Sequence, residues 1–122
     1  MASPLLDPKL IAEIKLVERS SGQKNVLSGL VSKLEAHLAA FPAGFAACVA
    51  SGDANGAARA AHTMQGSCRQ LGAGALGDLF ATIEASAKAG DYAEAQRRFE
   101  GGAELIARSL EALKRAEGPP NP

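Results

Sequence analysis

The segment LSGLVSKLEAHLAAFPAGFAACV, from Leu27 to Val49, decides the fold because its apolar residues recur at steps of three and four. That spacing lines one side of a long helix with Leu27, Leu30, Val31, Leu34, Leu38, Phe41, Phe45 and Val49. Pro42 interrupts the backbone hydrogen bonding, but the apolar stripe keeps its phase across the proline. The segment therefore predicts one kinked helix that ends at Gly52.

The segments on either side of this helix also have helical patterns. Before it, Asp7 and Pro8 are typical of an N-cap and a first helical position, and their helix is expected to reach about Arg19. Further helices are expected over residues 53–71, 74–89 and 91–113. Scarce aromatic residues and abundant Ala and Leu agree with an all-α protein. The short connections predict an up-down-up-down antiparallel four-helix bundle with an additional N-terminal capping helix.

Length and charge narrow the possible functions. The 122 residues suffice for one domain, expected over residues 1–117, and the tail GPPNP at 118–122 is expected to be flexible. Thirteen basic and thirteen acidic residues cancel, so no overall field attracts nucleic acid or an anionic membrane. Since neither a signal peptide nor a membrane-spanning stretch is recognisable, a cytoplasmic protein is expected.

The helix expected over residues 53–71 has an apolar side and a polar side. The polar side gathers Asn55, Arg59, His62, Gln65, Gly66 and Arg69. A glycine inside a helix costs up to about 1 kcal/mol relative to alanine, so Gly66 suggests that another molecule approaches His62 closely. No carboxylate of this segment shares that side, which excludes a local Ser-His-Asp relay. An exposed imidazole is mostly neutral near neutral pH and can attack phosphorus with its free lone pair.

The stretch HTMQGSCRQLGA, from His62 to Ala73, and the stretch LGDLFATIE, from Leu76 to Glu84, together resemble the signature of histidine-containing phosphotransfer (HPt) domains. In this resemblance His62 matches the phosphorylated histidine, Gly66 the glycine that leaves room for a partner, and Ser67 the small residue after it. The resemblance extends weakly over nearly the whole chain.

One position departs from the family pattern. Gln65 stands where the family most often has a lysine that helps to hold the phosphoryl group. Glutamine can donate a hydrogen bond but carries no charge. We therefore expect Arg59 or Arg69 to supply the missing positive charge.

The resemblance implies a phosphorelay, in which a receiver-domain aspartyl phosphate transfers its phosphoryl group to His62 and a second receiver aspartate takes it onward. The implied partners are response-regulator receiver domains, including that of a hybrid histidine kinase, and the chain is expected to be a monomer. No metal site is expected in the chain, because Mg²⁺ would bind the acidic residues of the receiver. The segment Gly72–Ala75 lacks the lysine and the hydroxyl residue of a nucleotide phosphate loop, so the protein is not expected to be an ATP-dependent kinase.

Other interpretations remain open at this point. A helical adaptor could bind a signalling partner without chemistry. A dimeric histidine kinase bundle also carries an exposed histidine, but two chains then contribute two helices each. A zinc site built from His37, Cys48, His62 and Cys68 would lack the paired short spacings of structural zinc sites, and both cysteines are expected to be free and apolar in behaviour.

Overall fold

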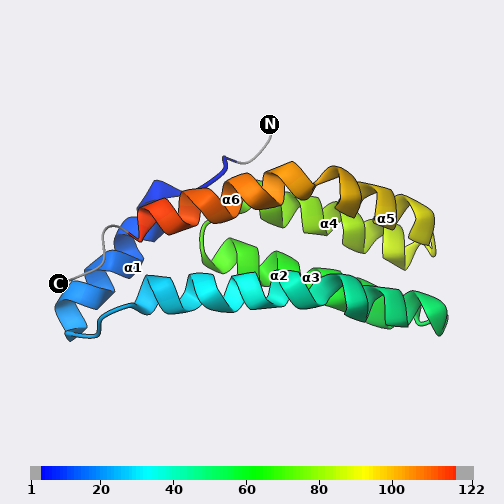
Figure 1. Cartoon of the computed structure of the whole chain (residues 1–122), viewed down its shortest axis with the longest axis horizontal. Coiled ribbons are helices and arrows are strands. Elements are labelled where there is room, and N and C mark those ends of the chain that lie inside the picture. The colour runs from blue at the N-terminus through cyan, green and yellow to red at the C-terminus, as the bar shows by residue number, and fades with distance from the viewer. Residues whose placement is uncertain (1–3, 118–122) are drawn as a thin grey trace.

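The structure, a computed structural model, describes residues 4–117, and every regular element in this range is a helix (Figure 1). The helices are α1 (Pro8–Ser21), α2 (Val26–Ala50), α3 (Ala54–Gln70), α4 (Gly74–Lys88), α5 (Tyr92–Gly101) and α6 (Ala103–Ala116). The predicted all-α class is therefore confirmed, whereas the tail predicted at 118–122 lies outside the described residues. None of the helices within residues 4–117 has the length and apolar character needed to cross a membrane.

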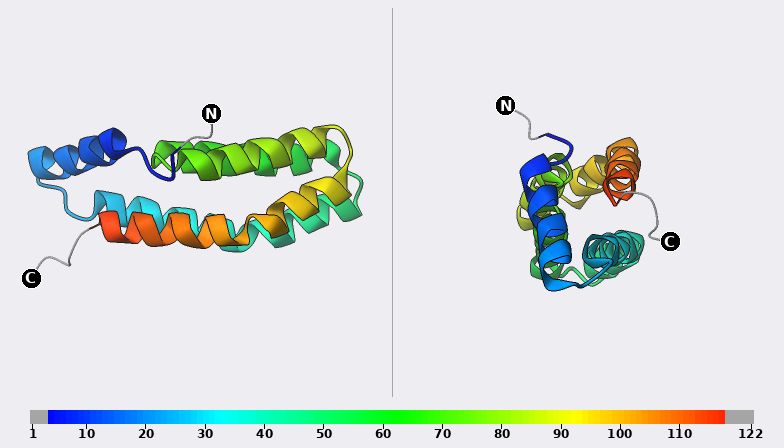
Figure 2. Two further views of the ribbon diagram at one scale, coloured as in Figure 1. Left: turned by 90° about the horizontal axis from the view of Figure 1, so that it is seen from above. Right: turned by 90° about the vertical axis from the view of Figure 1, so that its left-hand side faces the viewer.

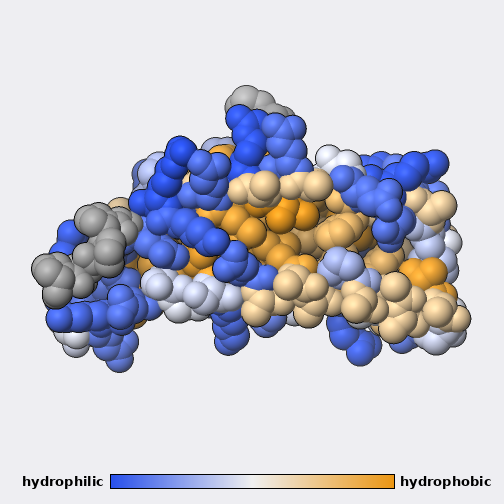
Figure 3. All heavy atoms as spheres, in the orientation of Figure 1, coloured by the Kyte–Doolittle hydropathy of each residue, from blue (hydrophilic) through white to orange (hydrophobic). Residues whose placement is uncertain are grey.

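The long helices lie side by side along the molecule. α2 runs in one direction and α3 returns beside it, and the same relation holds between α4 and the α5–α6 pair (Figure 1). Seen from the end, α3 and α4 form one side of the bundle, and α2 and α6 form the opposite side (Figure 2). α1 packs against α2 and extends the line of α3 and α4 beyond their ends (Figure 2). The α2–α6 side shows apolar atoms between its two helices (Figure 3).

The apolar stripe of α2 supplies much of the core. Its buried members are Leu27, Val31, Leu34, Leu38, Phe41 and Phe45. The ring centroid of Phe41 lies 5.4 Å from that of Phe45, 5.2 Å from that of Phe80 on α4 and 5.1 Å from that of Phe99 on α5. The helix continues through Pro42, which confirms the prediction of one helix rather than two.

Side-chain caps begin the helices where the sequence predicts them. The carboxylates of Asp7, Asp53 and Asp91 accept hydrogen bonds from backbone N–H groups of the first helical turns at 3.0, 2.8 and 3.1 Å. The turn after α3 contains Gly72 at φ +75°, a conformation that glycine adopts without strain. The Asp7 N–H donates to the Gly72 carbonyl at 2.8 Å, so the start of α1 is tied to the turn between α3 and α4.

The prediction of one helix over residues 91–113 is wrong, because the chain forms α5 and α6 with a break at Gly102. A Cβ atom at Gly102 would lie 2.4 Å from Leu79 Cδ2, so a larger residue there would require the Leu79 side chain on α4 to move. The two adjacent glycines, Gly101 and Gly102, also lower the helix propensity at this point. The break lets the segment bend along α4 and then continue beside α2 (Figure 2).

Candidate functional site

His62 lies near the middle of α3, on the side that faces away from the core. The opposite side of α3 buries Ala57, Ala58, Ala61, Met64 and Cys68. This leaves the His62 side chain 70% exposed. The amphipathic pattern of α3 therefore presents the imidazole to solvent, on the side of the bundle that α3 and α4 form.

A carboxylate from the neighbouring helix α4 holds the imidazole. His62 Nδ1 lies 3.1 Å from Oε1 of Glu84, whose side chain is only 14% exposed. An ionised carboxylate can only accept, so Nδ1 carries the hydrogen and Nε2 keeps the free lone pair. No carboxylate of α3 itself lies on the histidine side, so the pattern of this helix did not predict Glu84. The available signal was its place at the end of the stretch LGDLFATIE.

Glu84 remains ionised because two donors compensate its burial. Burial raises the pKa of the Glu84 carboxyl, but the hydrogen bonds from His62 and Lys88 outweigh this effect and bring the pKa below its ordinary value of 4.5. Lys88, one turn further along α4, places its Nζ 3.1 Å from Glu84 Oε2. The site therefore contains an imidazole and an ammonium group joined by one carboxylate.

Two further polar residues of α3, Gln65 and Arg69, form a row of hydrogen bonds that leads to Glu84. With its amide oriented to satisfy both neighbours, Gln65 donates to Glu84 Oε1 at 3.1 Å and accepts from Arg69 Nε at 3.2 Å. Arg69 Nη2 also donates to Asp78 Oδ1 of α4 at 3.0 Å. The guanidinium of Arg59 forms no hydrogen bond or ion pair with the residues that the structure describes. Of the two arginines predicted to supply positive charge, one is paired with a carboxylate and the other is unpaired within residues 4–117.

Gly66 leaves open space beside the histidine. A Cβ atom at this position would meet no atom within 4 Å apart from the local helix backbone, so the fold itself does not require glycine there. Ser67 is half-buried and lines a groove of about 150 Å³ between α2 and α3. The groove also contains His37, whose Nδ1 is buried without a hydrogen-bond partner in the described part of the chain. Of the two residues expected near the partner, Gly66 faces solvent, whereas Ser67 faces α2.

Neither metal ligation nor thiol chemistry is suggested by the other reactive residues. Within residues 4–117, no three or more His, Cys, Asp and Glu side chains are grouped so that they could hold a metal ion. Both cysteines are free, with Cys48 partly buried and Cys68 buried. Burial raises the pKa of the Cys68 thiol to about 12, so this thiol stays protonated and unreactive.

Comparison with protein-family models matches residues 25–116 to the model of the Hpt domain. The matched region contains α2 to α6, and therefore His62 together with every side chain bonded to Glu84, whereas α1 precedes it. Comparisons with curated proteins and with solved structures give no match.

Proposed function

Because the chain belongs to the Hpt domain family, which takes part in histidine phosphotransfer in phosphorelays, we propose that His62 is its phosphoacceptor. The proposed reaction takes a phosphoryl group from a receiver-domain aspartyl phosphate and passes it to the aspartate of a second receiver. The observation that carries this proposal is the exposed imidazole whose Nδ1 is bonded to Glu84 and whose Nε2 is free to react.

The hydrogen bond between His62 Nδ1 and Glu84 leaves Nε2 as the nitrogen that reacts in the transfer step. The Nε2 lone pair attacks phosphorus in line with the bond to the aspartyl oxygen. The N–P bond forms as the P–O bond breaks, and the receiver aspartate leaves as a carboxylate with the electron pair. The ring keeps the hydrogen on Nδ1 and becomes positively charged, and the ionised Glu84 beside it stabilises that charge. The same bond changes in reverse pass the phosphoryl group from Nε2 to the aspartate of a second receiver.

The other residues of the site are assigned supporting roles. Gln65 orients Glu84 through its amide N–H, and Arg59 is free to move toward a phosphoryl group on the ring. Arg69 contributes less because Asp78 already neutralises its charge. Gly66 admits the approaching receiver, and the small side chain of Ser67 lines the groove between α2 and α3.

We also propose the partners of the chain, its location and its scaffold. The partners are response-regulator receivers, among them the receiver of a hybrid histidine kinase, and Mg²⁺ is bound by their acidic residues. The chain acts in the cytoplasm as a monomeric carrier without ATP-dependent kinase activity of its own. Its scaffold is one domain over residues 1–117, an up-down-up-down bundle with α1 as a cap, and the chain course in Figures 1 and 2 supports this topology.

Incubation with receivers carrying a labelled aspartyl phosphate tests the proposal. We expect label on this protein that is labile in acid and stable in alkali, as a phosphohistidine is, and we expect His62→Gln to abolish it. The matched control is His37→Gln, since the chain contains two histidines and this variant should keep the label. A receiver that binds tightly but never labels the wild-type protein would instead support a helical adaptor. A survey of the receivers of the source organism at short times would identify the preferred partners.

A further inference from the structure

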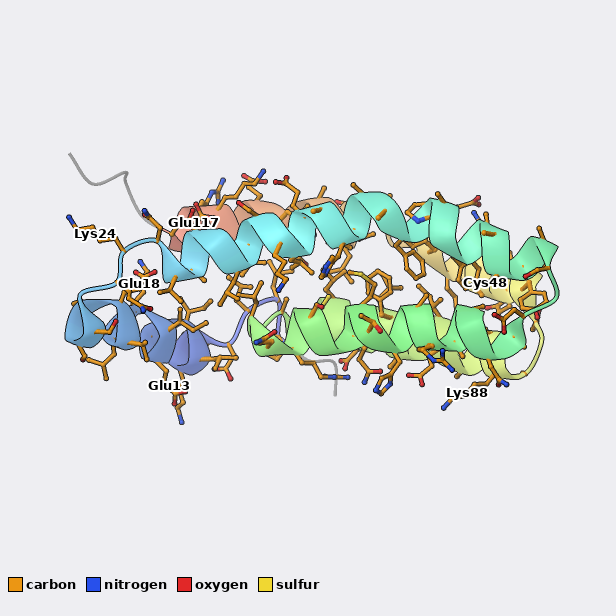
Figure 4. All side chains as sticks on the ribbon, turned by 90° about the horizontal axis from the view of Figure 1, so that it is seen from below. Glu13, Glu18, Lys24, Cys48, Lys88 and Glu117 are labelled. Atoms are coloured by element: carbon orange, nitrogen blue, oxygen red, sulfur yellow. The ribbon has the colours of Figure 1, made fainter. Side chains whose placement is uncertain are left out.

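Lys88 is the basic side chain most directly connected to His62. It lies in the last turn of α4, and its Nζ is bonded to Glu84 Oε2, while the other oxygen of the same carboxylate is bonded to the imidazole. The side chain is 66% exposed and projects from the bundle (Figure 4). A single carboxylate thus separates an exposed ammonium group from the ring that accepts the phosphoryl group in the proposed function.

The two arginines of α3 are less suitable sources of positive charge at Nε2. Arg69 has its Nε engaged by Gln65 and its Nη2 engaged by Asp78. Arg59 is unpaired among residues 4–117, but no contact within that range holds it near the ring. Lys88, in contrast, is held one carboxylate away from His62 before any partner arrives.

An incoming aspartyl phosphate requires such a cation. The charge of Glu84 stabilises the ring but repels the phosphoryl group, and an ammonium group on the same carboxylate reduces that repulsion. A phosphoryl group on Nε2 is a dianionic acceptor that can compete with a carboxylate for the same donor. The flexible four-carbon stem of lysine allows Nζ to turn from Glu84 toward that group.

We propose that Lys88 replaces, from α4, the positive charge that Gln65 does not provide from α3. Before transfer it neutralises Glu84, and during transfer it donates a hydrogen bond to the phosphoryl oxygens. This inference rests on the proposed function, because it assigns a role at the same histidine.

The first test measures the maximal rate of label transfer from a saturating phosphorylated receiver. Lys88→Gln should lower this rate about tenfold, which is the change expected from losing one charge-assisted hydrogen bond. Lys88→Arg should stay near the wild-type rate. The matched control is Lys114→Gln, since Lys114 also pairs with a glutamate, Glu35 at 2.8 Å, but between α2 and α6 on the opposite side of the bundle. This control should transfer at the wild-type rate.

Two double variants distinguish a contact with the phosphoryl group from support of Glu84 alone. Lys88→Gln should still slow transfer when Glu84→Gln is already present, whereas a purely supporting lysine would have no further effect. Gln65→Lys should restore most of the rate lost in Lys88→Gln, because it returns the charge to the position where the family usually has it.

The outcomes separate this inference from the proposed function. Wild-type label on His62 together with an unchanged maximal rate in Lys88→Gln would overturn the role of Lys88 and leave the phosphotransfer function intact. It would also be overturned if adding Lys88→Gln to Glu84→Gln caused no further loss of transfer rate. A wild-type protein that no receiver labels would overturn both.

Discussion

At the scale of single residues, the phosphoacceptor role proposed for His62 depends on open space beside the ring and on the hydrogen bond at Nδ1. Glu84 fixes the ring nitrogen that carries the hydrogen, and Gly66 leaves the neighbouring surface free of side-chain atoms. A glycine inside a helix lowers stability, so its presence where the fold has room for a side chain is best explained by the needs of a partner. This explanation can be tested by adding the missing methyl group.

Gly66→Ala is expected to stabilise the protein by up to about 1 kcal/mol, because alanine is the better helix former and its Cβ would meet no atom within 4 Å apart from the local helix backbone. The same variant should slow transfer from a phosphorylated receiver roughly tenfold or more, because the methyl group displaces the docked partner. Urea denaturation and transfer kinetics measure the two effects. Gly44→Ala, at an equally open position on α2, should give the stabilisation without the slower transfer. Equal transfer rates in both variants would show that Gly66 has no role in access.

At the scale of elements, several helix ends depend on residues of their own segment, but the start of α2 depends on α1. Asn25 at the N-cap has φ +67° and provides no side-chain cap. The Leu27 N–H instead donates to Glu18 Oε1 at 2.8 Å. Glu18 points from α1 toward α2, whereas Glu13 on the same helix points into solvent (Figure 4). α1 therefore caps the end of another helix through a tertiary contact.

Glu18→Ala is expected to lower the free energy of unfolding by about 1 kcal/mol, because the Leu27 N–H loses its acceptor and the helix dipole loses a negative charge. Denaturation measures the total effect, and amide hydrogen exchange at Leu27 should show where it arises. Glu13→Ala, at an exposed acidic position of the same helix, should change stability by less than about 0.5 kcal/mol. Similar losses in the two variants would exclude the cap as the cause.

At the scale of the whole molecule, the site and the apolar atoms visible in Figure 3 lie on opposite sides. His62 and its partners belong to the α3–α4 side, and the apolar atoms visible in Figure 3 belong to the α2–α6 side. Between them lies a core that contains Phe41, Phe80 and the buried thiol of Cys68.

The stability of the fold should depend on pH, because the Cys68 thiol ionises much more readily in the unfolded chain than in the core.

Between pH 9 and pH 12 the Cys68 thiol is expected to reduce stability as pH rises. Burial raises its pKa from the ordinary value of 9.0 to about 12, so in this range the native state holds up to one more proton than the unfolded state. The unfolding free energy then falls by up to about 1.4 kcal/mol per pH unit. Denaturation at several pH values measures the slope, and Cys68→Ala should flatten it, since other groups titrate equally in both proteins. Parallel slopes would contradict a buried, protonated thiol.

The local elements of this protein follow from patterns that the sequence displays directly. The stripe of α2 predicts its buried residues, and the aspartates at positions 7, 53 and 91 predict three helix starts. The break at Gly102 was not predicted, although the adjacent glycines Gly101 and Gly102 are visible in the sequence, and the contact with Leu79 comes from another helix. Local propensity alone does not reveal such a contact.

The sequence by itself determined the all-α class and the main helices, and it placed His62 on the polar side of α3. Only the tertiary structure decided that Glu84, 22 residues away, holds His62, that Lys88 shares this carboxylate, and that Glu18 caps α2. The physical reason is that helical periodicity fixes the direction of a side chain relative to its own helix axis. Which helix lies opposite, and at what height along it, is set by packing of the whole bundle.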